Sequence, residues 1–171
     1  MRRTLSSNRG FTLTEAAVAM VIFGIVMAIA YPNLAQSNRN HRLLSAASEV
    51  EATLSRARSA AVTTQDPVRV TLDPTTNQLL LDQDTTGDGN FDRMVRIVDI
   101  DDDIDFTNVA FAGGNTVVFD QRGAPDNPGI VVLSNGGDSG QRVLVSAGSG
   151  AVSVRSVPLH TEGESGAGVG Y

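Results

Sequence analysis

The sequence of 171 residues contains no cysteine, no tryptophan and no lysine. Without cysteine the chain can form neither disulfides nor thiolate metal sites, and the redox compartment stays open. All 13 basic residues are arginines, against 19 acidic residues. Three of them, Arg2, Arg3 and Arg9, lie in the first ten residues, so the remaining chain has 10 arginines and a net charge of −9. Such an acidic body repels nucleic acid and anionic lipid unless its arginines cluster.

An apolar segment, residues 11–30, follows this basic leader directly. Its roughly twenty residues would span about 30 Å as a helix, which matches the hydrocarbon thickness of a bilayer. The leader arginines favour a cytoplasmic N-terminus and an exported C-terminal body. Three kinds of segment share this order: a secretory signal peptide cleaved after Ala30, an uncleaved membrane anchor, and a prepilin leader followed by its helix.

Glu15 distinguishes between these alternatives because it lies inside the apolar segment. A carboxylate there costs about 2.5–3.5 kcal/mol on insertion scales and usually marks a function, whereas a secretory signal gains nothing from it. Cleavage after Gly10 would create an ammonium group on Phe11 that could neutralise Glu15, within one chain or between neighbours. The first turn of a helix also favours an anion. Glu15 therefore favours the prepilin interpretation.

Residues 9–15, which read RGFTLTE, resemble the processing motif of type IV pilins and type II secretion pseudopilins. The resemblance implies that a prepilin peptidase cuts between Gly10 and Phe11 and methylates the new amine of Phe11. It also implies that Glu15 guides docking onto the previous subunit and that Pro32 kinks the helix. The implied partners are the peptidase, other pilins or pseudopilins in a filament, and an inner-membrane assembly platform.

The same resemblance implies a location. The chain would cross the bacterial inner membrane once, with a cytoplasmic N-terminus and a periplasmic or otherwise extracytoplasmic head, and would enter a pilus or pseudopilus. No enzyme activity is expected.

Beyond Pro32 the helical pattern continues as an amphipathic stripe. Apolar residues recur at spacings of three and four: Leu43, Ala47, Val50, Leu54, Ala57 and Ala61. The helix should end at Asp66, because the residue before a proline avoids the helical region. We therefore expect five segments: a leader over 1–10, a transmembrane and filament-core helix over 11–31, an amphipathic helix over 32–65, a β-rich head over 66–157 and a flexible tail over 158–171.

After Pro67 the apolar pattern changes to a period of two, which is typical of strands. We expect strands over 68–72, 78–81, 93–98, 116–120, 129–134, 141–146 and 151–155, separated by loops rich in Gly, Asp, Asn and Pro. The expected fold is α+β: a pilin-like lollipop in which one long N-terminal helix packs on an antiparallel β-sheet or sandwich.

The pattern of strands and glycines over 116–123, 129–133, 141–146 and 150–154 resembles the head of the GspH/FimT group. This second resemblance implies a minor pseudopilin of the type II secretion system, a structural and assembly subunit of the periplasmic pseudopilus. The alternative is a FimT-like minor type IV pilin that acts in pilus biogenesis and DNA uptake.

One loop, LDQDTTGDGNFD, is crowded with aspartates: Asp82, Asp84, Asp88 and Asp92. Calcium loops need oxygen ligands at alternate positions, a glycine at the sharp turn and a closing bidentate acid. Counted from Asp84, the glycine is present as Gly89, whereas Val95 stands where the closing acid should be. Calcium and a solvated acidic turn both remain interpretations of this loop.

Arg142 and Arg155 are the candidates for DNA contact, by resemblance to FimT-like pilins that bind DNA through arginines near the C-terminus. A Gly-Arg-x-Arg cluster expected near Gly150 is absent, since the sequence there reads GAVSVR. With a body of net charge −9, a nucleic acid partner is not the leading expectation.

Overall fold

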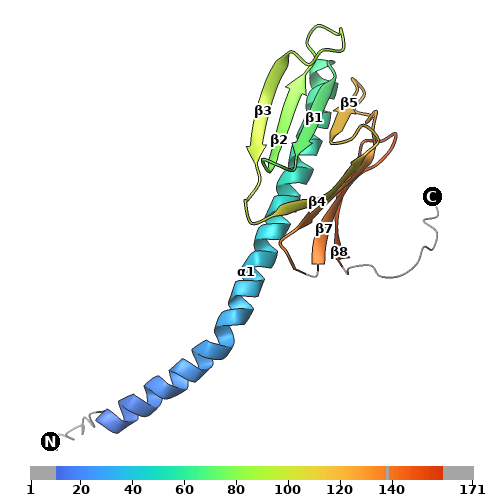
Figure 1. The fold of residues 1–171 in the computed structure, drawn as a ribbon. Coiled ribbons are helices and arrows are strands. Elements are labelled where there is room, and N and C mark those ends of the chain that lie inside the picture. The colour runs from blue at the N-terminus through green and yellow to red at the C-terminus, as the bar shows by residue number, and fades with distance from the viewer. Residues whose placement is uncertain (1–10, 138, 160–171) are drawn as a thin grey trace, which may run out of the picture. The chain divides into compact units, whose positions relative to one another are not determined.

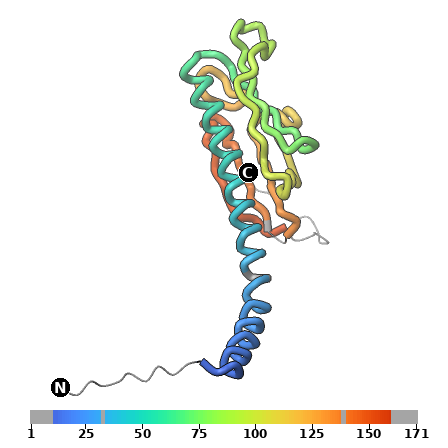
Figure 2. The backbone as a smooth tube through the Cα atoms, turned by 90° about the vertical axis from the view of Figure 1, so that its left-hand side faces the viewer, coloured from blue at the N-terminus to red at the C-terminus, as the bar shows by residue number. Residues whose placement is uncertain are grey.

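The computed structural model describes residues 11–137 and 139–159. The expected leader, with Gly10, and the part of the expected tail from His160 onward lie outside these residues. The chain divides into two compact units, residues 1–38 and residues 39–171. Figure 1 shows the course of the chain, and Figure 2 shows it turned by 90°.

The first unit consists of the N-terminal part of helix α1, Leu13–Thr64. Its side chains from Leu13 to Ile29 are all exposed, and most of them are apolar. By length and composition this part of the helix could cross a membrane. The helix is continuous across Pro32, so the expected kink at that residue stays a prediction.

The second unit contains the rest of α1 and eight strands. The strands are β1 (Val68–Asp73), β2 (Gln78–Gln83), β3 (Arg93–Asp99), β4 (Asp105–Phe111), β5 (Thr116–Phe119), β6 (Gly129–Ser134), β7 (Ser139–Val145) and β8 (Val152–Pro158). They form two antiparallel sheets, one in the order β3-β2-β1-β5 and one in the order β4-β6-β7-β8. The predicted α+β fold, a long helix packed on antiparallel strands, is confirmed.

The predicted apolar stripe of α1 forms one side of the core. All six stripe residues are buried, and they pack in one cluster with the inward-facing residues of both sheets. The sheet residues include Val70 and Leu72 from β1 and Val131 and Leu133 from β6. Several stripe positions are alanines, which let the strands approach the helix closely. Figure 2 shows this part of α1 running alongside strands of both sheets.

All seven predicted strands are confirmed, and β4 is an eighth that the sequence did not predict. Residues 99–105 are rich in aspartate and show no apolar alternation, and β4 begins at the last of these aspartates, Asp105. Its pairing with β6 shifts register between Phe106 and Asn108, so its apolar residues do not alternate regularly. At the other end of the head, β8 extends to Pro158, one residue into the segment expected as a flexible tail.

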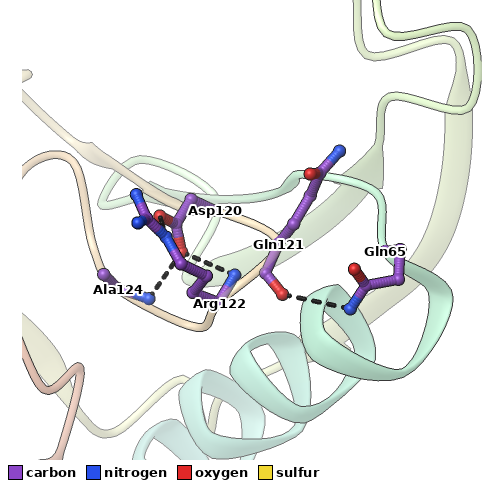
Figure 3. A network of polar contacts seen from close by, with 5 residues as sticks. All are labelled: Gln65, Asp120, Gln121, Arg122 and Ala124. Atoms are coloured by element: carbon purple, nitrogen blue, oxygen red, sulfur yellow. Dashed lines mark hydrogen bonds and ion pairs between the residues drawn. The ribbon is translucent and has the colours of Figure 1, made fainter.

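The end of α1 is fixed by the turn that follows β5 (Figure 3). Gln65 adopts a left-handed conformation with φ of 61° and donates from Nε2 to the carbonyl oxygens of Val62 and Gln121. In the turn, the Asp120 carboxylate accepts hydrogen bonds from the backbone N–H groups of Arg122 (2.9 Å) and Ala124 (2.8 Å). These bonds hold the turn in contact with the last turns of the helix.

Two glycines with positive φ, Gly123 and Gly150, bring their loops against Arg58 of α1. A Cβ on Gly123 would lie 3.1 Å from the Arg58 Cγ, and a Cβ on Gly150 would overlap the Gly123 carbonyl oxygen. No side chain larger than hydrogen therefore fits at Gly150.

We predict that Gly150→Ala destabilises the head more than Gly148→Ala does. Both positions have positive φ, 63° and 72°, but a Cβ on Gly148 meets open space. Holding an alanine in the left-handed conformation costs about 1–2 kcal/mol, and this cost should lower the stability of both variants. Only Gly150→Ala should add an overpacking cost of about 1–3 kcal/mol. Thermal unfolding of the full chain in detergent, followed by circular dichroism, measures the stability of both variants. Equal losses of stability in the two variants would contradict the predicted overlap at Gly150.

A second prediction concerns Asp120. The backbone hydrogen bond from Ala124, and then those from Arg122, lower the pKa of this carboxyl group below its usual 3.8. A lowered folded-state pKa means that the stabilisation is complete above about pH 4 and is lost as the pH falls through the folded-state value. Asp120→Asn should therefore lower the melting temperature at pH 7 and lessen its decline below pH 4. Asp126→Asn, at an exposed carboxylate in the same loop, is the control and should change neither.

Candidate processing and docking site

The N-terminal end of α1 holds the residues expected to be processed and to dock. Phe11 is exposed and, with Thr12, precedes the first helical residue, Leu13. The backbone N–H of Glu15 donates to both the Oγ1 (3.3 Å) and the carbonyl oxygen (3.1 Å) of Thr12. Thr12 is therefore the N-cap of the helix. Gly10, on the other side of the expected cleavage point, lies outside the described residues.

Thr12 is a residue of this site that the sequence reasoning missed. The signal was present as Thr12-x-x-Glu15, the pattern of a capping box, in which a threonine N-cap is followed three residues later by a glutamate. The cap fixes the start of the helix, so it places Glu15 in the first turn. There the positive end of the helix dipole favours a carboxylate.

The Glu15 carboxylate lies on an otherwise apolar stretch of helix surface. Within residues 11–137 and 139–159 it forms no ion pair. A charged group on a helix that enters a membrane or packs against apolar helices needs an opposite charge nearby. In apolar surroundings the carboxylate at this end of α1 would therefore favour a cationic partner.

The four aspartates suggested for calcium do not converge on one point. Asp84 is buried, with 3% of its surface exposed, and its carboxylate accepts hydrogen bonds from the backbone N–H groups of Gly87 and Gly89. Asp82 instead forms an ion pair with Arg69, 3.0 Å away. In the described part of the chain, no three acidic or histidine side chains lie close enough together to hold a metal ion.

The other two aspartates of the loop also bind groups of the loop itself. Asp92 accepts from the N–H and hydroxyl of Thr85, and Asp88 accepts from Asn90. Hydrogen bonding to their charged forms lowers the pKa of both carboxyl groups, first through the backbone N–H groups of Thr85 and Asn90. These aspartates act as the hydrogen-bond acceptors of a compact turn, and the structure gives no support to a calcium site.

Arg142 and Arg155, the candidates for DNA contact, lie side by side. They are directly opposite each other in the antiparallel pairing of β7 with β8, and both are exposed. Neither forms an ion pair with a described residue. Because like charges directly opposite on paired strands are destabilising, an anion between them would be favourable.

The sequence matches two known protein families. Residues 46–150 match the family described as Type II transport protein GspH, and residues 5–31 match the prokaryotic N-terminal methylation motif. No curated protein sequence matches the chain.

Among solved structures, the fold is similar to the type IV minor pilin FimU of Pseudomonas aeruginosa. The two are 18% identical with a TM-score of 0.53, and the similarity covers 66% of this chain and 92% of the FimU chain. The minor pseudopilin EpsH from the type 2 secretion system of Vibrio cholerae is 15% identical with a TM-score of 0.51, over 70% of this chain and 99% of the EpsH chain.

An exposed apolar helix that opens with the methylation motif and continues into the core of a two-sheet head is the arrangement of a pilin-like protein. The GspH match extends over more than half of the sequence. The chain belongs to the GspH family.

Proposed function

We propose that this chain is a minor pseudopilin of the type II secretion system, a subunit that helps to build the periplasmic pseudopilus and so supports protein secretion. The observation that carries the proposal is the joining of a GspH head, matched over residues 46–150, to a methylation motif, matched over residues 5–31. Members of the GspH family whose role is known are structural subunits. The activity proposed for this chain is therefore assembly rather than catalysis.

The proposed sequence of events begins with processing. A prepilin peptidase cuts between Gly10 and Phe11 and methylates the amine of Phe11. The exposed apolar part of α1 holds the chain in the inner membrane, with the head on the periplasmic side. The assembly platform then passes the subunit into the filament, where its apolar helix surface is covered by the helices of other pilin-like subunits.

Glu15 directs the docking step in this proposal. Its carboxylate pairs with the N-terminal amine of the neighbouring subunit. Each charge then neutralises the other in an apolar environment, where either charge alone would be costly. The Thr12 cap supports this role because it holds Glu15 in the first turn of α1. Pairing between chains sets the axial position of one subunit relative to the next.

We predict that Glu15→Ala leaves cleavage and methylation largely intact and lowers incorporation of the chain into filaments at least about tenfold, which corresponds to roughly 1.4 kcal/mol. The reason is the loss of the charge partner for the neighbouring amine. Mass spectrometry of the N-terminus reports processing, with an N-methylated Phe11 expected in both forms, and immunoblotting of sheared filaments reports incorporation.

Glu49→Ala provides the matched control, because it removes a half-buried glutamate, paired with Arg56 at 4.0 Å, from the same helix outside the apolar segment. It should leave incorporation unchanged. Normal incorporation of Glu15→Ala would rule out the charge-pairing step, and a mature chain that starts at Tyr31 would rule out the prepilin processing altogether.

A second candidate function is that of a FimT-like minor type IV pilin that binds DNA for uptake. The observation that favours it is the direct pairing of the exposed Arg142 and Arg155 on β7 and β8. Two guanidinium groups at this spacing could hold one backbone phosphate between them. The net charge of −9 outside the leader opposes the approach of any polyanion, which is why this function ranks second.

If the chain binds DNA, the full chain in detergent should slow the migration of a short duplex in a gel. The binding affinity should fall as the salt concentration rises. Removing both arginines, Arg142→Ala with Arg155→Ala, should reduce the slope of log affinity against log salt by about one, because the two arginines share one phosphate and each neutralised phosphate contributes about one. Arg56→Ala, on α1, serves as the control and should keep the slope. Absence of a shift at about 50 mM salt would exclude this function.

A further inference from the structure

Strand β3 forms an open edge of the first sheet. It pairs with β2 on one side, and no described strand pairs with its other side. Five consecutive residues, Arg93 to Ile97, are exposed. An edge strand with free backbone donors and acceptors is a template for another strand, and proteins usually keep such edges short or polar.

The edge carries exposed apolar side chains. Met94, Val95 and Ile97 are 58%, 48% and 46% exposed. Among residues 39–159, six large apolar side chains are exposed, and three of them lie on this one strand. Such a concentration on a single edge indicates a contact surface rather than the scattered exposure that is ordinary on protein surfaces.

The β-bulge in β3 determines on which face of the sheet each of its side chains lies. Because the register with β2 shifts between Leu81 and Asp82, Arg96 lies opposite Leu81 and Arg93 lies opposite Gln83. Both β2 residues are buried, so the two arginines share the inner face of the sheet. Met94 and Ile97 lie opposite the alternate β2 residues and share the outer face.

The two arginines are not neutralised within the head. Neither Arg93 nor Arg96 forms an ion pair with any residue of 11–137 or 139–159, although the chain has a surplus of acidic residues. On the next strands, by contrast, Arg69 of β1 pairs with Asp82 of β2. The edge therefore offers positive charge on one face and apolar surface on the other.

We propose that β3 docks an extended segment of a different pilin-like subunit of the same filament, a segment in which acidic and apolar residues alternate. Side chains of an added strand point alternately to the two faces of the sheet, so its acidic residues meet Arg93 and Arg96 while its apolar residues meet Met94 and Ile97. The inference rests on the proposed function, since it takes its partner from the filament.

Electrostatics favour a different subunit over a second copy paired in register. A second copy paired in parallel and in register would place Arg93 opposite Arg93 and Arg96 opposite Arg96, and like charges directly opposite are destabilising. A permanent filament neighbour rather than secreted cargo is favoured by the apolar surface. An uncovered apolar edge promotes aggregation, so it needs a partner that covers it constantly.

The test uses a photo-crosslinking amino acid at Val95 in the full chain, expressed with the other pilin-like subunits of its system. We expect an adduct with one of these subunits, mapped by mass spectrometry to an alternating acidic and apolar segment. The same crosslinker at Leu144, an exposed apolar position on β7, is the control and should give no such adduct.

Charge reversal at the edge, Arg93→Glu with Arg96→Glu, should reduce the Val95 adduct at least tenfold, whereas Arg56→Glu on α1 should leave it unchanged. A conservative pair, Arg93→Gln with Arg96→Gln, separates docking from simple edge protection. If the arginines only protect the edge, this pair will increase self-association and leave the adduct unchanged, and the inference is overturned.

Other outcomes also overturn it: an adduct only with a second copy of the chain, an adduct with secreted cargo, or no adduct at Val95 while the chain enters filaments normally. The last result leaves the proposed function intact, because filament entry is measured separately. Failure of the wild-type chain to enter filaments at all counts instead against the proposed function.

Discussion

The packing of one stripe of α1 against the inner faces of two sheets is the interaction on which the head depends. Each sheet has four strands and one apolar face, and such a sheet is stable only when that face is covered. The stripe covers both, and its alanines at 47, 57 and 61 let the strands come close. The same continuous helix carries Glu15 in its first turn. A single element therefore carries both the core of the head and the surface proposed for docking.

A buried stripe and an unpaired carboxylate place different demands on that helix. The apolar surface of the stripe is covered within the chain itself, because the sheets bury every one of its residues. Glu15 and the apolar residues around it have no partner among the described residues. Apolar surroundings cover the exposed apolar side chains, but they raise the free energy of the Glu15 carboxylate unless a positive charge lies nearby. A filament of pilin-like helices, each with an N-terminal amine, has both properties.

Local patterns predicted much of this from the sequence. The stripe followed from spacings of three and four, and seven strands followed from a period of two. β4 was missed because a register shift breaks its alternation and an aspartate opens it. The aspartate loop suggested calcium, but whether carboxylates converge on a cation or accept backbone N–H groups depends on turn geometry that spacing does not determine. The ion pair of Arg42 with Asp103, 61 residues away, likewise depends on how the sheets pack on the helix.

The distribution of arginines separates two kinds of surface on an acidic protein. Arg93 and Arg96 lie beside Met94, Val95 and Ile97, so any partner there must supply both carboxylates and apolar side chains, which only a polypeptide does. Arg142 and Arg155 instead face each other across two strands, and one small anion satisfies both. The surplus of negative charge over the rest of the chain acts on the two surfaces unequally. It repels a polyanion over its whole length, but it scarcely opposes a short strand with a few acidic residues and an apolar face. The charge balance of the chain therefore favours protein contact at β3 over nucleic acid contact at β7 and β8.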